Sequence, residues 1–310
     1  MNKKDIEVIF MGTSDFAKEI LKSLIDDEYA IKAVFTQPDK KAGRKREIKP
    51  NLIKDFSKLN NIPTFQPDKL NSEAISIIKK IAPDLIIVAA YGKIIPKAIL
   101  EIPKFKCINV HPSLLPKFRG PSPIQNAILA GEKETGITII LMDEKVDHGA
   151  ILAQEKIAIS PEDTTETLTQ KMISKSSDLL LQTIPRWIQG EIKEQKQDDS
   201  LAAYCKLIER EDGKISWNEE ARTIYNKHRA FQPWPGIFCF MEIKGKTTRI
   251  KLNKITVAEI ESETKHCIGE VFRQDNRIAV RTAKEAIIIE EIQIEGKKSI
   301  GINEFIKGYS

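Results

Sequence analysis

The sequence predicts an α/β protein, in which a Rossmann-like, doubly wound and mostly parallel sheet is followed by a smaller C-terminal β-barrel domain of OB-like form. Two observations support this prediction. Over roughly the first 190 residues, short apolar runs alternate with helical patterns, as in sheets built from strand–helix–strand units. After residue 236, several short β-rich stretches follow one another, separated by glycine and charged turns.

Hydrophobic periodicity predicts the elements of the first domain. Residues 84–90, DLIIVAA, are apolar almost without interruption, as in a strand that is covered on both faces. Ser14 and Asp15 can cap a helix over the following residues, where the apolar side chains have helical spacing. Further strands or extended pieces are expected at residues 6–11, 31–35, 63–66, 107–110 and 135–142, and further helices at 50–59, 71–81 and 164–188.

Composition suggests where the two domains meet. Residues 196–206 are polar and are interpreted as a linker, which places one domain at residues 1–195 and the other at 207–310. The second domain is expected to contain a helix at about 218–231, then the turn sequence QPWPG. Its strands are expected at residues 237–243, 247–257, 267–272, 277–281 and 286–294.

Composition also indicates a globular protein of a reducing compartment. The 310 residues are 41% hydrophobic and 30% charged, and no apolar run reaches the roughly 18–20 residues that cross a bilayer. The chain enters a strand too early to leave room for a signal peptide. No C-x-x-C pair occurs, so we expect free thiols, no metal site and a cytoplasmic location. The cysteines are Cys107, Cys205, Cys239 and Cys267.

Basic residues gather in two places, although the formal net charge is only +5. Two basic clusters far apart in the sequence suit a polyanionic partner, and the alternative for each is a solvated surface. The first cluster comprises Lys40, Lys41, Arg44, Lys45, Arg46 and Lys49, and the second comprises Lys244, Lys246, Arg249, Lys251 and Lys254, with no acid between its members.

Three polar residues form the best candidate for a catalytic group. Asn109 and His111 lie two residues apart at the end of an apolar strand, so their side chains project to the same side. Asp147, in a loop that ends at Gly149, can return to orient the imidazole. Amide, imidazole and carboxylate together suit the handling of an oxyanion and a proton in acyl or formyl transfer. Taken singly, each has a plain alternative: a capping amide, a structural histidine or a solvated acid.

The segment after His111 predicts a ligand-binding loop. Ser113, Leu114, Leu115 and Pro116 form a proline-bounded turn that can present backbone groups to a flat heterocycle. In sheets of this class ligands bind beyond the carboxyl ends of the strands, where this loop lies. The first turn, Gly12-Thr13-Ser14, lacks the G-x-G-x-x-G pattern, so a dinucleotide ligand is disfavoured.

The run NVHPSLLPKFRG, followed by GITIILMDEKVDHGAI, resembles the signature of the folate-dependent formyltransferases. That resemblance implies a Rossmann-like domain that uses 10-formyltetrahydrofolate as formyl donor, without a metal. It places the family's catalytic residues on Asn109, His111 and Asp147. Its folate-contacting residues fall on Ser113, Leu114, Leu115 and Pro116.

Three segments resemble the members of the family that act on initiator tRNA charged with methionine: FMGTSDFA near the start, QPDKKAGRKREIKP, and RAFQPWPG before the C-terminal strands. Gln232 stands where asparagine is more usual. The resemblance implies direct attack of the methionyl α-amine on the formyl carbon, tRNA binding by the basic loop and the C-terminal domain, and a monomeric enzyme. The tRNA contacts are expected at Lys40, Lys41, Arg44, Lys45 and Arg46.

Three other functions remain open from the sequence. The same catalytic residues would serve a formyltransferase for an amino sugar or a purine-pathway amine. They would also serve a folate hydrolase or a formyl-folate dehydrogenase module, in which water replaces the amine. A non-enzymatic RNA-binding module is the third alternative, and the intact catalytic set argues against it.

Overall fold

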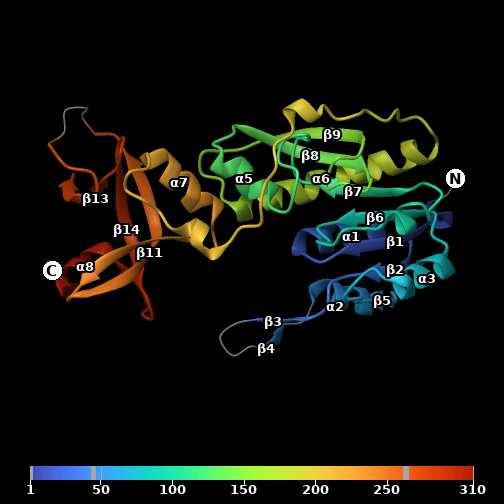
Figure 1. The fold of residues 1–310 in the computed structure, drawn as a ribbon, viewed down its shortest axis with the longest axis horizontal. Helices are drawn as coiled ribbons and strands as arrows, with labels where there is room; N and C mark the ends of the chain where they lie inside the picture. Colours follow the sequence, from blue (N-terminus) through green and yellow to red (C-terminus); the bar gives the residue numbers. More distant parts are fainter. Residues whose placement is uncertain (1–2, 43–46, 50, 261–264, 310) are drawn as a thin grey trace. The chain divides into compact units, whose positions relative to one another are not determined.

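The computed structural model describes residues 3–42, 47–49, 51–260 and 265–309 of the chain, which divides into two compact units (Figure 1). The predicted boundaries at 195 and 207 follow the order of the chain, whereas two short segments that precede residue 195 belong to the second unit. The first unit comprises Met1–Pro123, Glu134–Ala158 and Thr169–Lys206, and the second comprises Ile124–Lys133, Ile159–Leu168 and Leu207–Ser310.

A seven-stranded sheet with the order β5-β2-β1-β6-β7-β8-β9 forms the centre of the first unit. The strands from β5 to β7 are parallel, and β8 and β9 join antiparallel at one edge, which confirms a mostly parallel Rossmann-like sheet. The strands are β1 (Glu7–Gly12), β2 (Ala30–Phe35), β5 (Thr64–Phe65), β6 (Leu85–Ala89), β7 (Cys107–His111), β8 (Glu134–Leu141) and β9 (Ile151–Ala158).

Strand β9 was not predicted, because its alternating exposed and buried residues give a weaker signal than the apolar runs of β6 and β7. A short two-stranded ribbon, β3 (Lys40–Ala42) and β4 (Glu47–Lys49), was also missed, and it extends beyond α2, away from the large sheet (Figure 1). The helices are α1 (Asp15–Asp26), α2 (Leu52–Leu59), α3 (Ser72–Ile81), α4 (Lys97–Leu100), α5 (Pro123–Leu129) and α6 (Thr165–Ile188).

Local sequence accounts for the elements nearest the predicted site. Every residue of β6 and β7 is buried, as expected for central strands covered on both faces. Ser14 caps α1 by accepting a hydrogen bond from the backbone N–H of Ala17 at 3.3 Å, and the apolar side of that helix is buried. These parts form a rigid, dehydrated platform.

The carboxyl ends of β1, β6 and β7 lie side by side. In the register of these strands, Gly12 pairs with Ala89, and Val88 pairs with Asn109. Just beyond β6 the chain turns sharply through Ala90 and Gly92, with φ values of +45° and +71°. The sheet therefore presents one edge at which ligands of doubly wound proteins bind.

The second unit is built on an antiparallel half-barrel with the order β10-β11-β14-β13-β12, with β15 added beside β14. Helix α7 contacts β11 and β14, and α8 contacts β14 and β15. The small C-terminal β domain expected from the sequence is therefore present. Its elements are α7 (Ala221–Ala230), β10 (Ile237–Ile243), β11 (Lys246–Ala258), β12 (Val271–Gln274), β13 (Arg277–Arg281), β14 (Ala286–Ile294), β15 (Ser299–Gly301) and α8 (Ile302–Tyr309).

Buried polar contacts tie the segment at 159–168 to α7 within this unit. Arg229 is buried, and its Nη1 donates a hydrogen bond to the backbone oxygen of Asp163 at 2.9 Å. Thr165 Oγ1 donates to the backbone oxygen of Ala230 at 2.6 Å. Since these partners are distant in sequence, composition alone could not reveal that residues 159–168 belong to the second unit.

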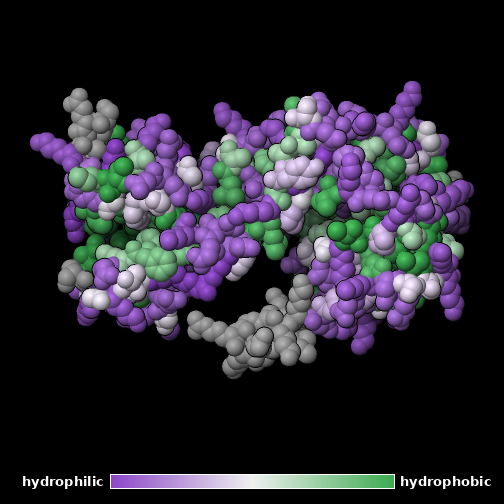
Figure 2. All heavy atoms as spheres, in the orientation of Figure 1, coloured by the Kyte–Doolittle hydropathy of each residue, from purple (hydrophilic) through white to green (hydrophobic). Residues whose placement is uncertain are grey.

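Hydrophilic side chains cover much of the visible face of each unit, with apolar patches between them (Figure 2). Among the residues that the structure describes, no helix combines the length and the hydrophobicity needed to span a bilayer.

We predict that the second unit loses stability in mild acid because of His228. Its side chain is buried and its Nε2 lies 2.7 Å from Gln232 Nε2, where a neutral ring accepts the amide proton. Burial, helped by the charge of Lys251, lowers the pKa of His228 to about 4. As the pH falls, the unfolded chain therefore takes up a proton at His228 before the folded chain does. The free energy of unfolding is at its full value above pH 6.5 and decreases by about 3 kcal/mol in all as the pH falls toward 4.

Urea unfolding followed by tryptophan fluorescence from pH 7.5 to 4.5 measures this loss. His228→Gln should flatten the decline, because its side chain carries no titrating group. An equal decline in the His228→Gln protein and the unsubstituted protein would contradict the assignment.

Candidate functional site

The structure brings the three candidate catalytic side chains together on one face of the sheet. Asn109 and His111 are the third and fifth residues of β7 and project to the same side. Both are almost fully buried, at 8% and 4% exposure. Because β7 is a buried central strand, these side chains stand on a backbone that cannot shift easily.

Asp147 reaches them from the loop between β8 and β9. Its carboxylate accepts hydrogen bonds from Asn109 Nδ2 at 3.3 Å and from the backbone N–H of Gly120 at 2.8 Å. The oxygen that binds Gly120, Oδ2, also lies 3.5 Å from Nδ1 of His111. The carboxylate is thus the point at which the strand, the loop after it and the β8–β9 loop meet.

Each nitrogen of the His111 ring faces an oxygen atom. Nε2 lies 3.0 Å from the backbone oxygen of Phe118, so it carries a proton and donates it. Nδ1 faces the Asp147 carboxylate, and a doubly protonated ring can donate to both oxygens. Of the two amide hydrogens of Asn109, one points to Asp147, and within the described residues the other has no recorded partner.

The four predicted folate-contacting residues divide into two pairs. Ser113 and Leu115 are engaged within the protein: the Ser113 hydroxyl donates to the Lys117 backbone oxygen, and the backbone N–H of Leu115 donates to Thr138 Oγ1. Leu114 and Pro116 are half-buried and keep part of their surface open. The loop is therefore a preformed turn, and its open apolar surface comes from these two side chains.

Sequence reasoning gave residues 196–206 only a linking role, yet this stretch lies against the loop after β7. The backbone N–H groups of Arg119 and Cys205 donate to the backbone oxygens of Ala203 and Arg119, each at 2.8 Å. Two side chains of the stretch, Gln197 and Asp199, also reach Arg119. A polar stretch has no hydrophobic periodicity, so no pattern in the sequence indicated that these residues contact Arg119.

Cys205 lies beside the loop after β7, and it is a structural residue. Its Sγ accepts a hydrogen bond from the backbone N–H of Ser122 at 3.4 Å and lies 3.2 Å from the backbone oxygen of Arg119. Burial raises the pKa of this thiol, and the charge of Asp147 adds to the effect. A protonated, enclosed thiol is a poor nucleophile.

The predicted tRNA-contacting residues are described only in part. Lys40 and Lys41 belong to β3, while Arg44, Lys45 and Arg46 lie outside the described residues. In the second basic cluster, Arg249 pairs with Glu295 at 3.2 Å, and Lys254 pairs with Glu290 at 2.6 Å. The fold therefore supplies to this cluster acids that its own sequence segment lacks.

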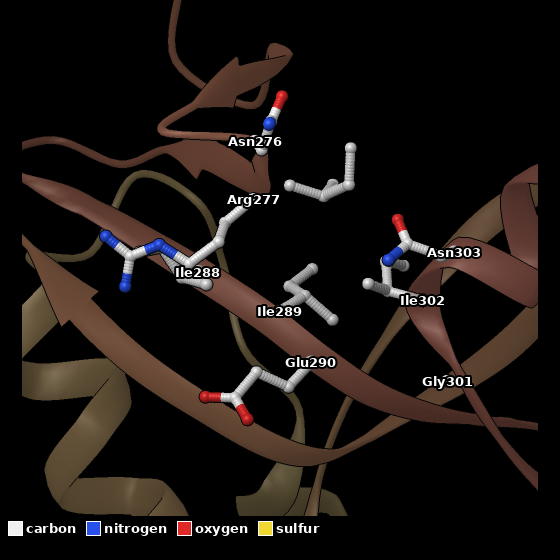
Figure 3. A pocket seen from close by; sticks show the side chains of 9 residues that line it. Asn276, Arg277, Ile288, Ile289, Glu290, Gly301, Ile302 and Asn303 are labelled. Atoms are coloured by element: carbon white, nitrogen blue, oxygen red, sulfur yellow. The ribbon is translucent and has the colours of Figure 1, made fainter.

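A separate hollow of about 220 Å³ lies in the second unit, between β13, β14 and the start of α8 (Figure 3). Isoleucine side chains line its floor, and Arg277 and Glu290 stand at its rim. Both charged groups have ion-pair partners, at 3.6 Å in Asp275 and 2.6 Å in Lys254. None of the predicted site residues lines this hollow.

Metal-ligating side chains do not cluster in the described part of the chain: no group of three or more His, Cys, Asp or Glu is arranged to hold an ion there. The polar groups at the end of β7 instead suit a reaction at a carbonyl carbon, where an amide donor, an imidazole and a carboxylate can manage charge and a proton.

Comparison with known proteins identifies the group to which this site belongs. The formyl transferase model matches residues 4–184, and the formyl transferase C-terminal domain model matches residues 207–310. The chain belongs to the formyl transferase family. The first match contains all three candidate catalytic residues, and the second contains the half-barrel.

Relatives in this family match over nearly the full chain. The methionyl-tRNA formyltransferase of Caldicellulosiruptor saccharolyticus is 41% identical, over 98% of this chain and 97% of its own. That of a Geobacillus species is 42% identical, over 98% of this chain and 94% of its own.

Solved structures share the fold at lower identity. An N-formyltransferase from Helicobacter canadensis, in complex with folinic acid and dTDP-3-aminofucose, has a TM-score of 0.67 at 20% identity, covering 92% of this chain and 98% of its own. HypX from Aquifex aeolicus, in complex with tetrahydrofolic acid, has a TM-score of 0.64 at 19% identity, covering 97% of this chain and 48% of its own. At these identities the likeness concerns the fold.

We predict that Gly149→Ala displaces the β8–β9 loop and with it Asp147. A Cβ atom at Gly149 would lie 1.7 Å from the backbone oxygen of Leu141, so the loop must move. A displacement of about 1 Å at the reacting groups can cost about 100-fold in rate.

Formyl-transfer rate and thermal unfolding, measured together, test this prediction. Gly301→Ala is the matched control, because a Cβ there meets nothing within 4 Å. Full activity of the Gly149→Ala protein would show that the loop tolerates the added methyl group.

Proposed function

We propose that this protein transfers the formyl group of 10-formyltetrahydrofolate to the α-amine of methionyl-initiator tRNA, giving N-formylmethionyl-tRNA for translation initiation. One observation carries the chemistry: the Asp147 carboxylate lies between the Asn109 amide and the His111 ring, at a distance of 3.3 Å and 3.5 Å from their nitrogens. The choice of acceptor is supported by relatives such as the one from Caldicellulosiruptor saccharolyticus, named methionyl-tRNA formyltransferase.

The proposed reaction is a direct displacement without an acyl-enzyme. The amine nitrogen forms a bond to the formyl carbon, and the bond from that carbon to the folate nitrogen then breaks. The proton lost by the amine passes to the departing folate nitrogen, so atoms and charges balance. The thiols of Cys107 and Cys205 are both buried and their pKa values are raised, which agrees with a mechanism that needs no protein nucleophile.

In this mechanism Asn109 and His111 stabilise the tetrahedral oxyanion. The second amide hydrogen of Asn109 is available for the oxygen, because only the first is directed at Asp147. His111 contributes positive charge from a ring whose Nε2 is held by the Phe118 backbone oxygen. Asp147 orients the ring and helps to relay the proton between the two nitrogens of the reaction.

We place the folate against the open apolar surface of Leu114 and Pro116, the half-exposed members of the predicted loop. Ser113 and Leu115 act indirectly, since their hydrogen bonds hold the turn in shape. A rigid apolar turn beside a small set of polar groups is the usual composition of a pocket for a heterocycle.

We place the tRNA on the basic loop, through Lys40, Lys41, Arg44, Lys45 and Arg46, and on the C-terminal half-barrel. Such contacts act mainly on phosphates, so binding should weaken steeply with salt, with a slope of about −0.7 to −0.9 per phosphate neutralised. The proposed enzyme is a cytoplasmic monomer, and sedimentation of the free protein tests the oligomeric state.

Single-turnover transfer of labelled formyl from 10-formyltetrahydrofolate tests the proposal. Methionyl-initiator tRNA should become labelled, and methionyl-elongator tRNA should not. Label on a nucleotide-linked amino sugar instead would favour a sugar formyltransferase, and release of formate without an acceptor would favour a hydrolase. Either result would overturn the assignment of the acceptor.

We predict that removing any member of the catalytic group lowers turnover and leaves the fold intact. Loss of one oxyanion donor typically costs about 10²–10³ in rate, so Asn109→Ala and His111→Ala should fall in that range. Asp147→Asn should also lose most activity, because the amide no longer carries the charge that orients His111. Turnover numbers and circular dichroism together provide the test, and a near-normal turnover of Asp147→Asn would rule out its role.

We predict that Arg44→Ala weakens the use of tRNA more than it weakens the use of folate. The KM for methionyl-initiator tRNA should rise, and the salt slope of tRNA binding should fall by about one phosphate contact. Arg186→Ala is a control for the loss of one exposed arginine elsewhere. Equal effects of Arg44→Ala on tRNA and on folate would assign this residue to the fold or to the folate site.

A further inference from the structure

We propose that Gln197 is a positioning residue for catalysis: its amide fixes the β8–β9 loop so that the Asp147 carboxylate stays between Asn109 and His111. This inference rests on the proposed function of that site. Gln197 belongs to the polar stretch at 196–206, far from the catalytic residues in sequence. Its side chain is buried, at 5% exposure.

The first step of the argument is that the loop needs an external restraint. Asp147 has φ +48°, in the left-handed region, where residues other than glycine are uncommon. Gly149 is pressed against the backbone oxygen of Leu141, so close that no Cβ fits. A loop in this conformation persists only when its surroundings determine it.

Gln197 supplies such a restraint from one side chain. Its Nε2 donates hydrogen bonds to two backbone oxygens of the loop, that of Asp147 at 2.9 Å and that of Gly149 at 2.8 Å. The two carbonyls stand on either side of residue 148, so the amide holds the loop at the point where it turns. The Gln197 amide binds the backbone of Asp147 and not its carboxylate. It therefore sets the position of the Asp147 side chain without occupying the carboxylate oxygens.

Arg119 locks Gln197 in turn. Gln197 Oε1 accepts from Nε and Nη2 of Arg119, at 3.1 Å and 2.8 Å, and the guanidinium is only 1% exposed. Both amide hydrogens and both lone pairs of Gln197 are thereby used, and the amide cannot be reversed without opposing like groups. Arg119 is itself held by Asp199 at 2.8 Å and by the hydroxyl of Tyr204 at 3.1 Å.

The same arrangement shows why Gln197 does not touch the substrates. A side chain that is buried and has every donor and acceptor engaged has nothing left to offer a ligand. Its effect must therefore pass through Asp147, which also meets Gly120, the residue after Arg119, through a backbone N–H at 2.8 Å. One arginine–glutamine pair thus connects the loop that carries the Asp147 carboxylate with the loop whose Gly120 N–H binds it.

Two substitutions distinguish the hydrogen bonds that Gln197 makes to the loop, which we call the clamp, from those that it makes to Arg119. Gln197→Ala removes the amide and leaves two loop carbonyls unpaired, whereas Gln197→Glu keeps acceptors for Arg119 and removes both donors to the loop. Both variants should lower kcat by about 10-fold to 100-fold, the range for a misplaced catalytic group, with KM for tRNA and folate within about twofold. Gln195→Ala and Gln195→Glu, at an exposed glutamine two residues earlier, should retain full activity.

A double-mutant cycle with Asp147→Asn tests whether Gln197 acts through Asp147. If it does, Gln197→Ala should lower kcat by less than about threefold in the Asp147→Asn protein, because the group that it positions is already lost. An independent, multiplicative loss would overturn the inference. So would a lower melting temperature with unchanged kcat, which is the result expected of a purely structural residue.

Hydrogen exchange over residues 143–149, followed by mass spectrometry, examines the clamp without catalysis. Amides of this loop should exchange about tenfold faster in Gln197→Ala than in Gln195→Ala, since two hydrogen bonds to it are lost. Equal hydrogen-exchange rates in the two variants would overturn the inference that Gln197 holds this loop. If instead the unsubstituted protein transfers no formyl group while exchange still responds, the proposed function fails and the clamp stands.

Discussion

The Asp147 carboxylate is the interaction on which the site depends. It accepts from the Asn109 amide and from the Gly120 backbone N–H, and it faces the His111 ring. Three separate segments of the chain therefore meet at one negative charge in a largely dehydrated place, where hydrogen bonds to charged groups are strong. Without this charge, no shared partner would orient the Asn109 amide and the His111 ring relative to each other.

The central sheet holds the segments that meet at Asp147 in fixed positions. Strands β6 and β7 are entirely buried, and β7 holds Asn109 between β6 and β8 and pairs His111 with β8. The antiparallel addition of β8 and β9 then brings a connecting loop back toward the same face. A fully parallel sheet would need a long crossover at this point, whereas a hairpin returns within a few residues.

Polar residues outside the catalytic group carry much of the remaining organisation. Arg119 is among the largest fully buried side chains of the protein, and its charge is balanced by Asp199 and by polar acceptors. Burial opposes the charge of this guanidinium, but the hydrogen bonds to Asp199 and Tyr204 outweigh it and raise the pKa of Arg119. A buried, fully bonded arginine specifies one arrangement of the loops around it, because any other arrangement would leave the charge unpaired.

The sequence by itself determined the class of fold and the positions of the buried strands, and it predicted Asn109, His111 and Asp147 as the catalytic residues, because apolar runs and short motifs are local properties. It did not reveal β9, the two segments at 124–133 and 159–168 that belong to the second unit, or the partners of Arg249 and Lys254. Nor did it reveal the hydrogen bonds of Gln197, which lies in a polar stretch without periodicity. Only the tertiary structure decided these points, because each depends on contacts with another segment of the chain, from the pairing of Ile140 with Ile151 in β8 and β9 to the hydrogen bond between Arg119 and Gln197, 78 residues apart.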